Sequence, residues 1–150
     1  MTSLQEGQKA ADFTALDENG NTVRLADFTG KKLVIFFYPK DNTPTCTVEA
    51  CNLRDNYADL KSRGYEVLGV SPDSQKRHQN FIGKHELPYT LISDPDLTMI
   101  NAYNVWGPKK FMGKEYDGLH RTTFIIDEKG YIERIIRKVK SKVHTEQILG

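Results

Sequence analysis

The 150-residue sequence contains only two cysteines and one tryptophan, and its formal net charge is only +1. Two cysteines in a chain of this length argue against a secreted scaffold stapled by disulfides. The nearly balanced charge argues against nucleic acid or an anionic membrane as the main partner, because such proteins usually carry a concentrated basic face. The longest unbroken apolar run, Leu33 to Tyr38, is far too short to cross a bilayer, which takes about 20 apolar residues.

The first ten residues, MTSLQEGQKA, are polar and lack the apolar centre of a signal peptide. We therefore expect a cytoplasmic location, where thiols are kept reduced. In such a compartment a close pair of cysteines is more often catalytic or metal-binding than a permanent crosslink.

The order of the expected elements indicates one α/β domain over residues 1–150, with 38% hydrophobic residues to form its core. Short β-branched and aromatic runs predict strands, and strands that alternate with helices predict a central mixed sheet flanked by helices. Asn19-Gly20 marks an N-terminal hairpin. The expected strands are 13–16, 22–25, 32–38, 65–71, 89–92, 121–127 and 131–139, the expected helices are 44–63, 71–87, 96–103 and 144–149, and 107–118 is expected to be a loop.

Cys46 follows a turn at the end of the expected strand 32–38, and Cys51 comes five residues later. Thr43 is suited to the N-cap of the next helix and Pro44 to its first position, which places Cys46 in the first turn. Free N–H groups and the helix dipole favour an anion there, and a thiolate is the reactive form of cysteine. Cys46 is therefore a candidate nucleophile.

The spacing of the two cysteines predicts a transient bond between them. On an ideal helix, residues five apart have Cα atoms about 8.7 Å apart and on different faces. A disulfide requires Cα atoms closer than about 7 Å. Cys46 and Cys51 can therefore bond only if the helix unwinds locally, which suits a redox cycle better than a structural crosslink.

Two other classes of thiol protein remain open from the residues alone. A structural zinc site needs four ligands, but His78, His85, His120 and His144 are scattered through different elements and are interpreted as ordinary histidines. We expect no metal and no cofactor. Disulfide oxidoreductases usually carry CxxC near a helix start, whereas this chain has CxxxxC.

The segment YPKDNTPTCTVEACNLRD carries Pro39, Thr43 and Cys46 in the PxxxTxxC pattern and resembles the Q-type peroxiredoxins, also called bacterioferritin comigratory proteins. The starting hairpin and the segments LISDPD, YNVWG and FMGKEYDGLHRTTFIIDEKG resemble the same subfamily in the same order, so the resemblance covers essentially the whole chain. It departs from the common TPGCT form at Thr45, where glycine is frequent.

The resemblance implies a thioredoxin-like fold and a site made of five residues. Cys46 would be the peroxidatic cysteine and Cys51 the resolving cysteine, with Pro39, Thr43 and Arg121 around them. From the residues alone, Cys51 also fits a core position and Arg121 a surface salt bridge. Glu49 stands where the family often has Glu or Gln, and we expect it on the helix surface or in a local ion pair.

The implied function is a thiol-dependent peroxidase that reduces hydrogen peroxide and organic hydroperoxides. Cys46 would become a sulfenic acid and condense with Cys51 to a disulfide, which thioredoxin or glutaredoxin would reduce. The subfamily favours a monomer. The alternative is a thiol–disulfide oxidoreductase or redox-relay protein without peroxidase activity.

Overall fold

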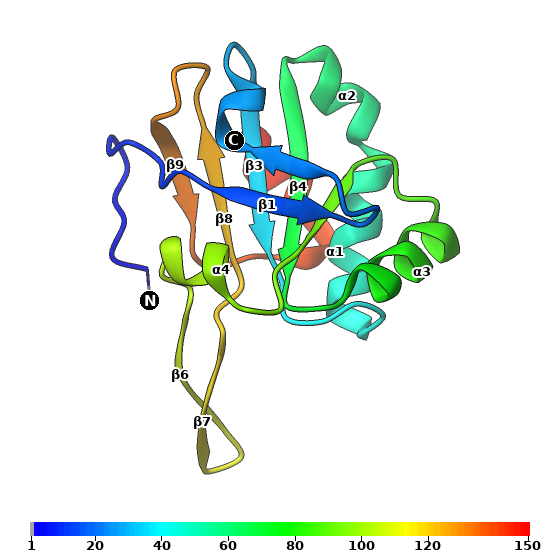
Figure 1. Cartoon of the computed structure of the whole chain (residues 1–150), viewed down its shortest axis with the longest axis vertical. Coiled ribbons are helices and arrows are strands. Elements are labelled where there is room, and N and C mark those ends of the chain that lie inside the picture. The colour runs from blue at the N-terminus through cyan, green and yellow to red at the C-terminus, as the bar shows by residue number, and fades with distance from the viewer. Residues whose placement is uncertain (1) are drawn as a thin grey trace.

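A seven-stranded mixed sheet forms the centre of the molecule (Figure 1). The computed structural model describes residues 2–150. The strand order is β2-β1-β5-β4-β3-β8-β9, in which β3, β4 and β5 are parallel and every other pairing is antiparallel. The strands are β1 (Thr14–Asp17), β2 (Thr22–Arg24), β3 (Lys32–Phe37), β4 (Tyr65–Ser71), β5 (Thr90–Ser93), β8 (Thr122–Ile126) and β9 (Ile132–Ile136).

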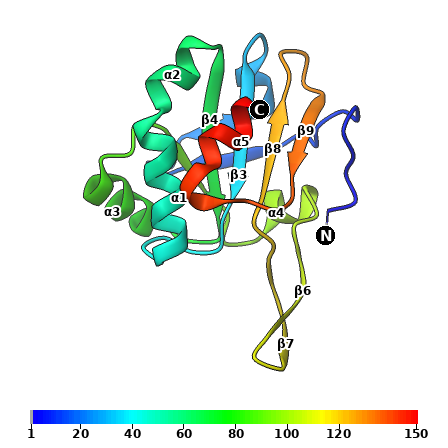
Figure 2. The same cartoon turned by 180° about the vertical axis from the view of Figure 1, so that it is seen from behind.

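Helices cover both faces of this sheet. The helices are α1 (Pro44–Asp55), α2 (Tyr57–Ser62), α3 (Gln75–His85), α4 (Thr98–Ala102) and α5 (His144–Leu149), with short 3₁₀ turns η1 (Leu25–Phe28) and η2 (Ser141–Val143). Helices α1, α2, α3 and α5 lie on one face, seen in Figure 2, and α4 lies on the other with the N-terminal segment. The expected thioredoxin-like α/β fold with its N-terminal hairpin is confirmed.

The central strand β3 separates two hydrophobic clusters. Its side chains alternate between the faces, as the pleat of a strand requires. Leu33, Ile35 and Phe37 pack toward α4, whereas Val34 and Phe36 pack toward α1. Every residue of β3 after Lys32 is buried, because helices cover both faces of the sheet at this strand. The strand therefore appears in the sequence as a continuous apolar run.

The expected helix 44–63 is two helices, because α1 ends at Asp55 and α2 begins at Tyr57. Asn56 lies between them, and its side-chain amide donates to the Asn52 carbonyl at 2.8 Å. Such local side-chain bonds compete with the helical backbone pattern. Val48 of α1 points outward and is 40% exposed.

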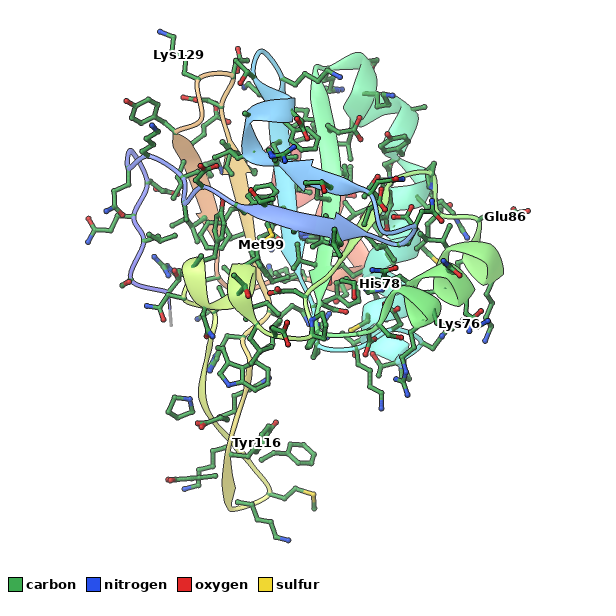
Figure 3. All side chains as sticks on the ribbon, in the orientation of Figure 1. Lys76, His78, Glu86, Met99, Tyr116 and Lys129 are labelled. Atoms are coloured by element: carbon green, nitrogen blue, oxygen red, sulfur yellow. The ribbon has the colours of Figure 1, made fainter. Side chains whose placement is uncertain are left out.

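The prediction of a loop over 107–118 was wrong. β6 (Trp106–Phe111) and β7 (Lys114–Leu119) form a separate two-stranded hairpin that projects from the sheet (Figure 1). Its turn residues Met112 and Gly113 both have positive φ, as in the tight turns of hairpins. Most side chains on both strands are exposed, so no buried face produced an alternating pattern. Tyr116, which is labelled in Figure 3, lies on this projecting segment.

The remaining expected elements are confirmed with adjusted bounds. Helix 71–87 is shorter, since α3 begins at Gln75 after Ser74, whose hydroxyl accepts from the Arg77 N–H at 3.2 Å. Helix 96–103 corresponds to α4, and the second hairpin to β8 and β9. Within residues 2–150 we found no helix with both the length and the apolar character needed to cross a bilayer.

Candidate active site

Cys46 lies in the first turn of α1, directly after the loop that leaves β3. Pro44 begins the helix and Thr43 precedes it with extended backbone, as expected. The Thr43 side chain does not cap the helix, however, because its hydroxyl donates to the Lys40 carbonyl at 3.0 Å. Cys46 is 1% exposed and therefore almost closed off from solvent. The thiol thus combines burial with the electropositive end of a helix.

Arg121 contacts the cysteine directly, through an Nη2–H that donates to Sγ at 3.2 Å. The sheet explains this meeting of residues 75 apart in sequence. Strand β8 is antiparallel to β3 and pairs Thr122 with Phe37, so Arg121 lies at the end of β3 from which the chain enters α1. The Arg121 side chain is 21% exposed, so it is the accessible part of the pair.

Glu49 is the third member of this group and was not expected to be buried. Its Oε1 accepts from the Arg121 Nη1–H at 2.9 Å, and its side chain is 0% exposed. Cys46, Glu49, Ala50 and Leu53 occupy one face of α1, at positions i, i+3, i+4 and i+7. The i, i+3 spacing from Cys46 was the signal in the sequence that could have placed Glu49 on the buried face.

The electrostatics of the group follow from burial and from Arg121. Burial raises the pKa of Glu49 to about 7, although the charge and hydrogen bond of Arg121 act to lower it. Burial acts to lower the pKa of Arg121, but the negative charges of Cys46 and Glu49 raise it overall. Arg121 is therefore a permanent cation shared between a thiol and a carboxyl group.

A second buried cluster holds the loop in front of α1. Asp41 accepts from the Tyr38 hydroxyl at 2.6 Å and contacts His78 Nδ1 at 2.6 Å. His78 Nε2 lies 2.9 Å from the Ile92 carbonyl oxygen, so an oxygen faces each ring nitrogen. Burial and the Asp41 charge raise the pKa of Tyr38 well above its usual value. Figure 3 labels His78 on α3.

This cluster was missed when the histidines were interpreted as ordinary. His78 and Phe81 are the buried residues of α3, three positions apart on the same face, and this spacing was the available signal. The backbone N–H of Asp41 also donates to Asp73 at 2.6 Å, which ties the loop to the segment before α3. The loop that carries Pro39 to Thr43 is therefore anchored at its centre.

The two cysteines are not brought together. Both are free, and both lie in the continuous helix α1, so the helical separation of about 8.7 Å applies. Cys51 lies off the buried face and is half-buried. Pro39 is half-buried and follows Tyr38 directly in the anchored loop. Of the five expected site residues, the structure places Arg121 in contact with Cys46.

Several other aromatic and histidine side chains lie outside this group. Trp106 packs against the hydrophobic cluster on the α4 face, and Phe111 is 66% exposed near the end of the projecting hairpin. His85 is the last residue of α3, and His120 lies between β7 and β8. Within the described part of the chain, no three His, Cys, Asp or Glu side chains gather in a way that would hold a metal ion.

Comparison with known proteins identifies the family. Residues 6–135 match the AhpC/TSA family. The chain is 48% identical over 149 residues to a putative peroxiredoxin Bcp of Haemophilus influenzae, covering 99% of this chain and 96% of the relative. It is 44% identical over 147 residues to peroxiredoxin Bcp of Bacillus subtilis, covering 98% of this chain and 94% of the relative.

Solved structures agree with the sequence relatives. The bacterioferritin comigratory protein of Xanthomonas campestris superimposes with a TM-score of 0.88 at 33% identity, over 99% of this chain and 95% of that one. The chain therefore belongs to the AhpC/TSA family and, within it, to the Bcp or Q-type peroxiredoxins, which are thiol peroxidases.

Proposed function

We propose that Cys46 is the thiol that reacts with peroxide. The observation that carries this proposal is the 3.2 Å contact from Arg121 to Cys46 Sγ in the first turn of a helix. The guanidinium and the helix N-terminus both stabilise negative charge on the sulfur. Arg121 is the more exposed of the two side chains and has several N–H donors, so it is also placed to bind an incoming peroxide oxygen.

The reaction balances with these groups. The Cys46 thiolate attacks one peroxide oxygen, an S–O bond forms and the O–O bond breaks. The electron pair of that bond leaves on the other oxygen, which takes up a proton to become an alcohol or water. Cys46 is then a sulfenic acid. Arg121 stabilises the charge that moves from sulfur to the leaving oxygen.

We propose that Cys51 resolves the sulfenic acid. Its thiol condenses with Cys46 to give a disulfide and one molecule of water, after the turn between them unwinds. A reduced dithiol protein of the thioredoxin type, or a glutaredoxin, then restores both thiols. Among residues 2–150 the chain offers no third cysteine for this role.

The substrates are proposed to include organic hydroperoxides as well as hydrogen peroxide. The Xanthomonas campestris relative is described by its alkyl peroxide reduction activity, and we extend that substrate class to this chain. We propose Thr43 and Pro39 as the flanking members of the site, with the anchored loop holding both in front of Cys46. A monomer in a reducing compartment is the working state.

The proposal is tested by peroxide turnover with a thioredoxin system in the wild type, Cys46→Ser and Cys51→Ser. Cys46→Ser should consume no peroxide. Cys51→Ser should consume about one equivalent, become a sulfenic acid and stop, because no disulfide forms within the chain. Normal turnover in Cys46→Ser would contradict the assignment. Disulfide exchange by the wild type without peroxide consumption would favour the oxidoreductase alternative.

A further inference from the structure

One oxygen of the buried Glu49 carboxyl group has no hydrogen-bond partner. Its Oε1 is bonded to Arg121, but its Oε2 is buried without a hydrogen bond. An unpaired polar atom in the interior is costly and calls for an explanation. His144 Nε2 lies 3.5 Å from this oxygen.

His144 is the first residue of α5 and is itself 0% exposed. Its Nδ1 lies 2.9 Å from Gln147 Oε1. The orientation of that amide is fixed, because Oε1 also accepts from the Lys140 N–H and the Gln147 Nε2–H donates to the Lys138 carbonyl. His144 Nδ1 must therefore carry a proton.

In the neutral ring the other nitrogen, Nε2, is therefore the hydrogen-bond acceptor. His144 Nε2 lies 2.8 Å from Thr123 Oγ1 and 3.5 Å from Glu49 Oε2. A neutral ring presents a lone pair at this position, and a protonated carboxyl group presents an O–H. The Thr123 hydroxyl donates to that lone pair in the structure, so a small movement that lets the Glu49 O–H share or take over this acceptor would satisfy the unpaired oxygen.

We propose that His144 is a positioning residue for the peroxidase reaction, which accepts a hydrogen bond from the protonated Glu49 carboxyl group at Nε2 and so holds Glu49 against Arg121 and Arg121 against Cys46. The chain of contacts runs from α5 through α1 to the segment before β8. His144 touches neither the sulfur nor the peroxide, so it acts through Glu49 and Arg121. This inference rests on the proposed role of Cys46.

The groups around Glu49 determine the protonation states of Glu49 and His144. The titratable or charged groups that face it are Arg121, His144, Tyr89 and the Cys46 thiol one turn earlier in α1. Burial raises the pKa of Glu49 to about 7, and burial together with Arg121 lowers the pKa of His144. Both directions favour a neutral carboxyl group beside a neutral ring.

The neutral pair leaves the positive charge of Arg121 available to Cys46 and the peroxide. As the pH rises through about 7, Glu49 loses its proton and competes for the guanidinium. The rate constant for the reaction with peroxide should therefore fall across this step relative to a variant in which residue 49 cannot ionise.

The test measures the second-order rate constant of the reduced full-length protein with hydrogen peroxide between about pH 5.5 and 8.5. His144→Gln keeps a polar atom near the position of Nε2, whereas His144→Asn keeps one near Nδ1 and leaves Glu49 Oε2 without a partner. His144→Asn should lower the rate constant about tenfold and shift the step, and His144→Gln should restore most of the rate. His85→Asn, a matched change on α3, should leave the rate and its pH profile unchanged.

Glu49→Gln is the second variant, and it should abolish the step near pH 7 while keeping the bond to Arg121. The inference is overturned if His144→Asn retains the rate and profile of the wild type, or if Glu49→Gln retains the step. It is also overturned if His144→Gln and His144→Asn lose rate equally with no shift of the step. Peroxide reactivity that survives Cys46→Ser would instead contradict the proposed function on which the inference rests.

Discussion

The two ends of α1 are held in place by different kinds of contact. The Cys46 end is held by charged groups, because Arg121 bonds to both Cys46 and Glu49. The Cys51 end is held by neutral hydrogen bonds to the C-terminal segment. Asn52 Oδ1 accepts from the N–H and hydroxyl of Thr145 at 2.8 and 2.9 Å, and Asn52 Nδ2 donates to the Lys142 carbonyl at 3.0 Å.

Because their contacts differ, we expect the two ends of α1 to respond differently during turnover. In the proposed reaction, oxidation converts the Cys46 thiolate to a neutral sulfenic acid, which binds a guanidinium less strongly than an anion does. The contacts of Asn52 contain no group that peroxide changes. We infer that oxidation itself loosens the Cys46 end, which must move, while the Cys51 end stays fixed to α5.

The largest expected effect comes from removing the anchor in front of the Cys46 end. Asp41→Ala leaves His78 and the Tyr38 hydroxyl without their buried partner, so the free energy of unfolding should fall by about 3–5 kcal/mol in urea titrations. Asp41→Asn retains hydrogen-bonding groups and should lose less. Asp59→Ala removes an exposed ion pair and should cost only about 0.2–1 kcal/mol. If Asp41→Ala lost as little stability as Asp59→Ala, Asp41 would not anchor the loop in front of α1.

Arg121→Gln removes the charged contacts that hold the Cys46 end of α1. The rate constant for the first reaction with peroxide should fall by about 10²–10³, because a donor to the developing charge is lost. The reaction is followed in a single turnover, so that recycling does not limit it. Arg63, which follows α2, has an exposed side chain, so Arg63→Gln serves as the control and should react like the wild type. An unchanged rate in Arg121→Gln would show that the contact with Cys46 has no role in catalysis.

Asn52→Ala removes the neutral hydrogen bonds that hold the Cys51 end of α1. The protein should lose about 1–3 kcal/mol of stability, since three hydrogen bonds to the C-terminal segment disappear. Its first reaction with peroxide should be affected much less than in Arg121→Gln. Asn80→Ala, an exposed change on α3, should alter stability by less than about 0.5 kcal/mol. An equal slowing of the peroxide step in both Asn52→Ala and Arg121→Gln would erase the distinction between the two ends.

The smallest effect is expected at Thr45, an exposed residue next to Cys46. Thr45→Gly should weaken the first turn by roughly 0.5–1 kcal/mol and so speed disulfide formation up to about fivefold. Ala58→Gly makes a similar change in α2, outside the stretch between the cysteines, and should leave that rate unchanged. Stopped-flow measurement of the second, disulfide-forming step compares the two. Equal acceleration in both variants would point to general loosening.

Local patterns were sufficient to predict the strands of the central sheet, most of the helices and the position of Cys46. Pro44 marked the helix start and the apolar run 33–38 marked the central strand, because both signals lie within a few residues. The break at Asn56 was missed, since a single side-chain bond ends α1 there. The hairpin β6–β7 was missed because its faces are mostly exposed and carry no alternation.

The contacts of the site depended on tertiary structure. Arg121 reaches Cys46 only because β8 pairs with β3, and sequence pattern alone contains no such information. The family resemblance supplied that pairing in advance. Neither source indicated that His144 would lie beside Glu49, because α5 follows Glu49 by more than 90 residues and returns to the same face of the sheet.

We propose that Cys46 attacks peroxide and that the turn between the cysteines opens to let Cys51 reach it. Hydrogen–deuterium exchange, combined with mass mapping of disulfides, tests it on the reduced protein and on protein treated with about one equivalent of peroxide. We expect a Cys46–Cys51 disulfide and faster exchange in residues 44–51, with α5 still protected. A Cys46–Cys51 disulfide with the protection of α1 unchanged would contradict it.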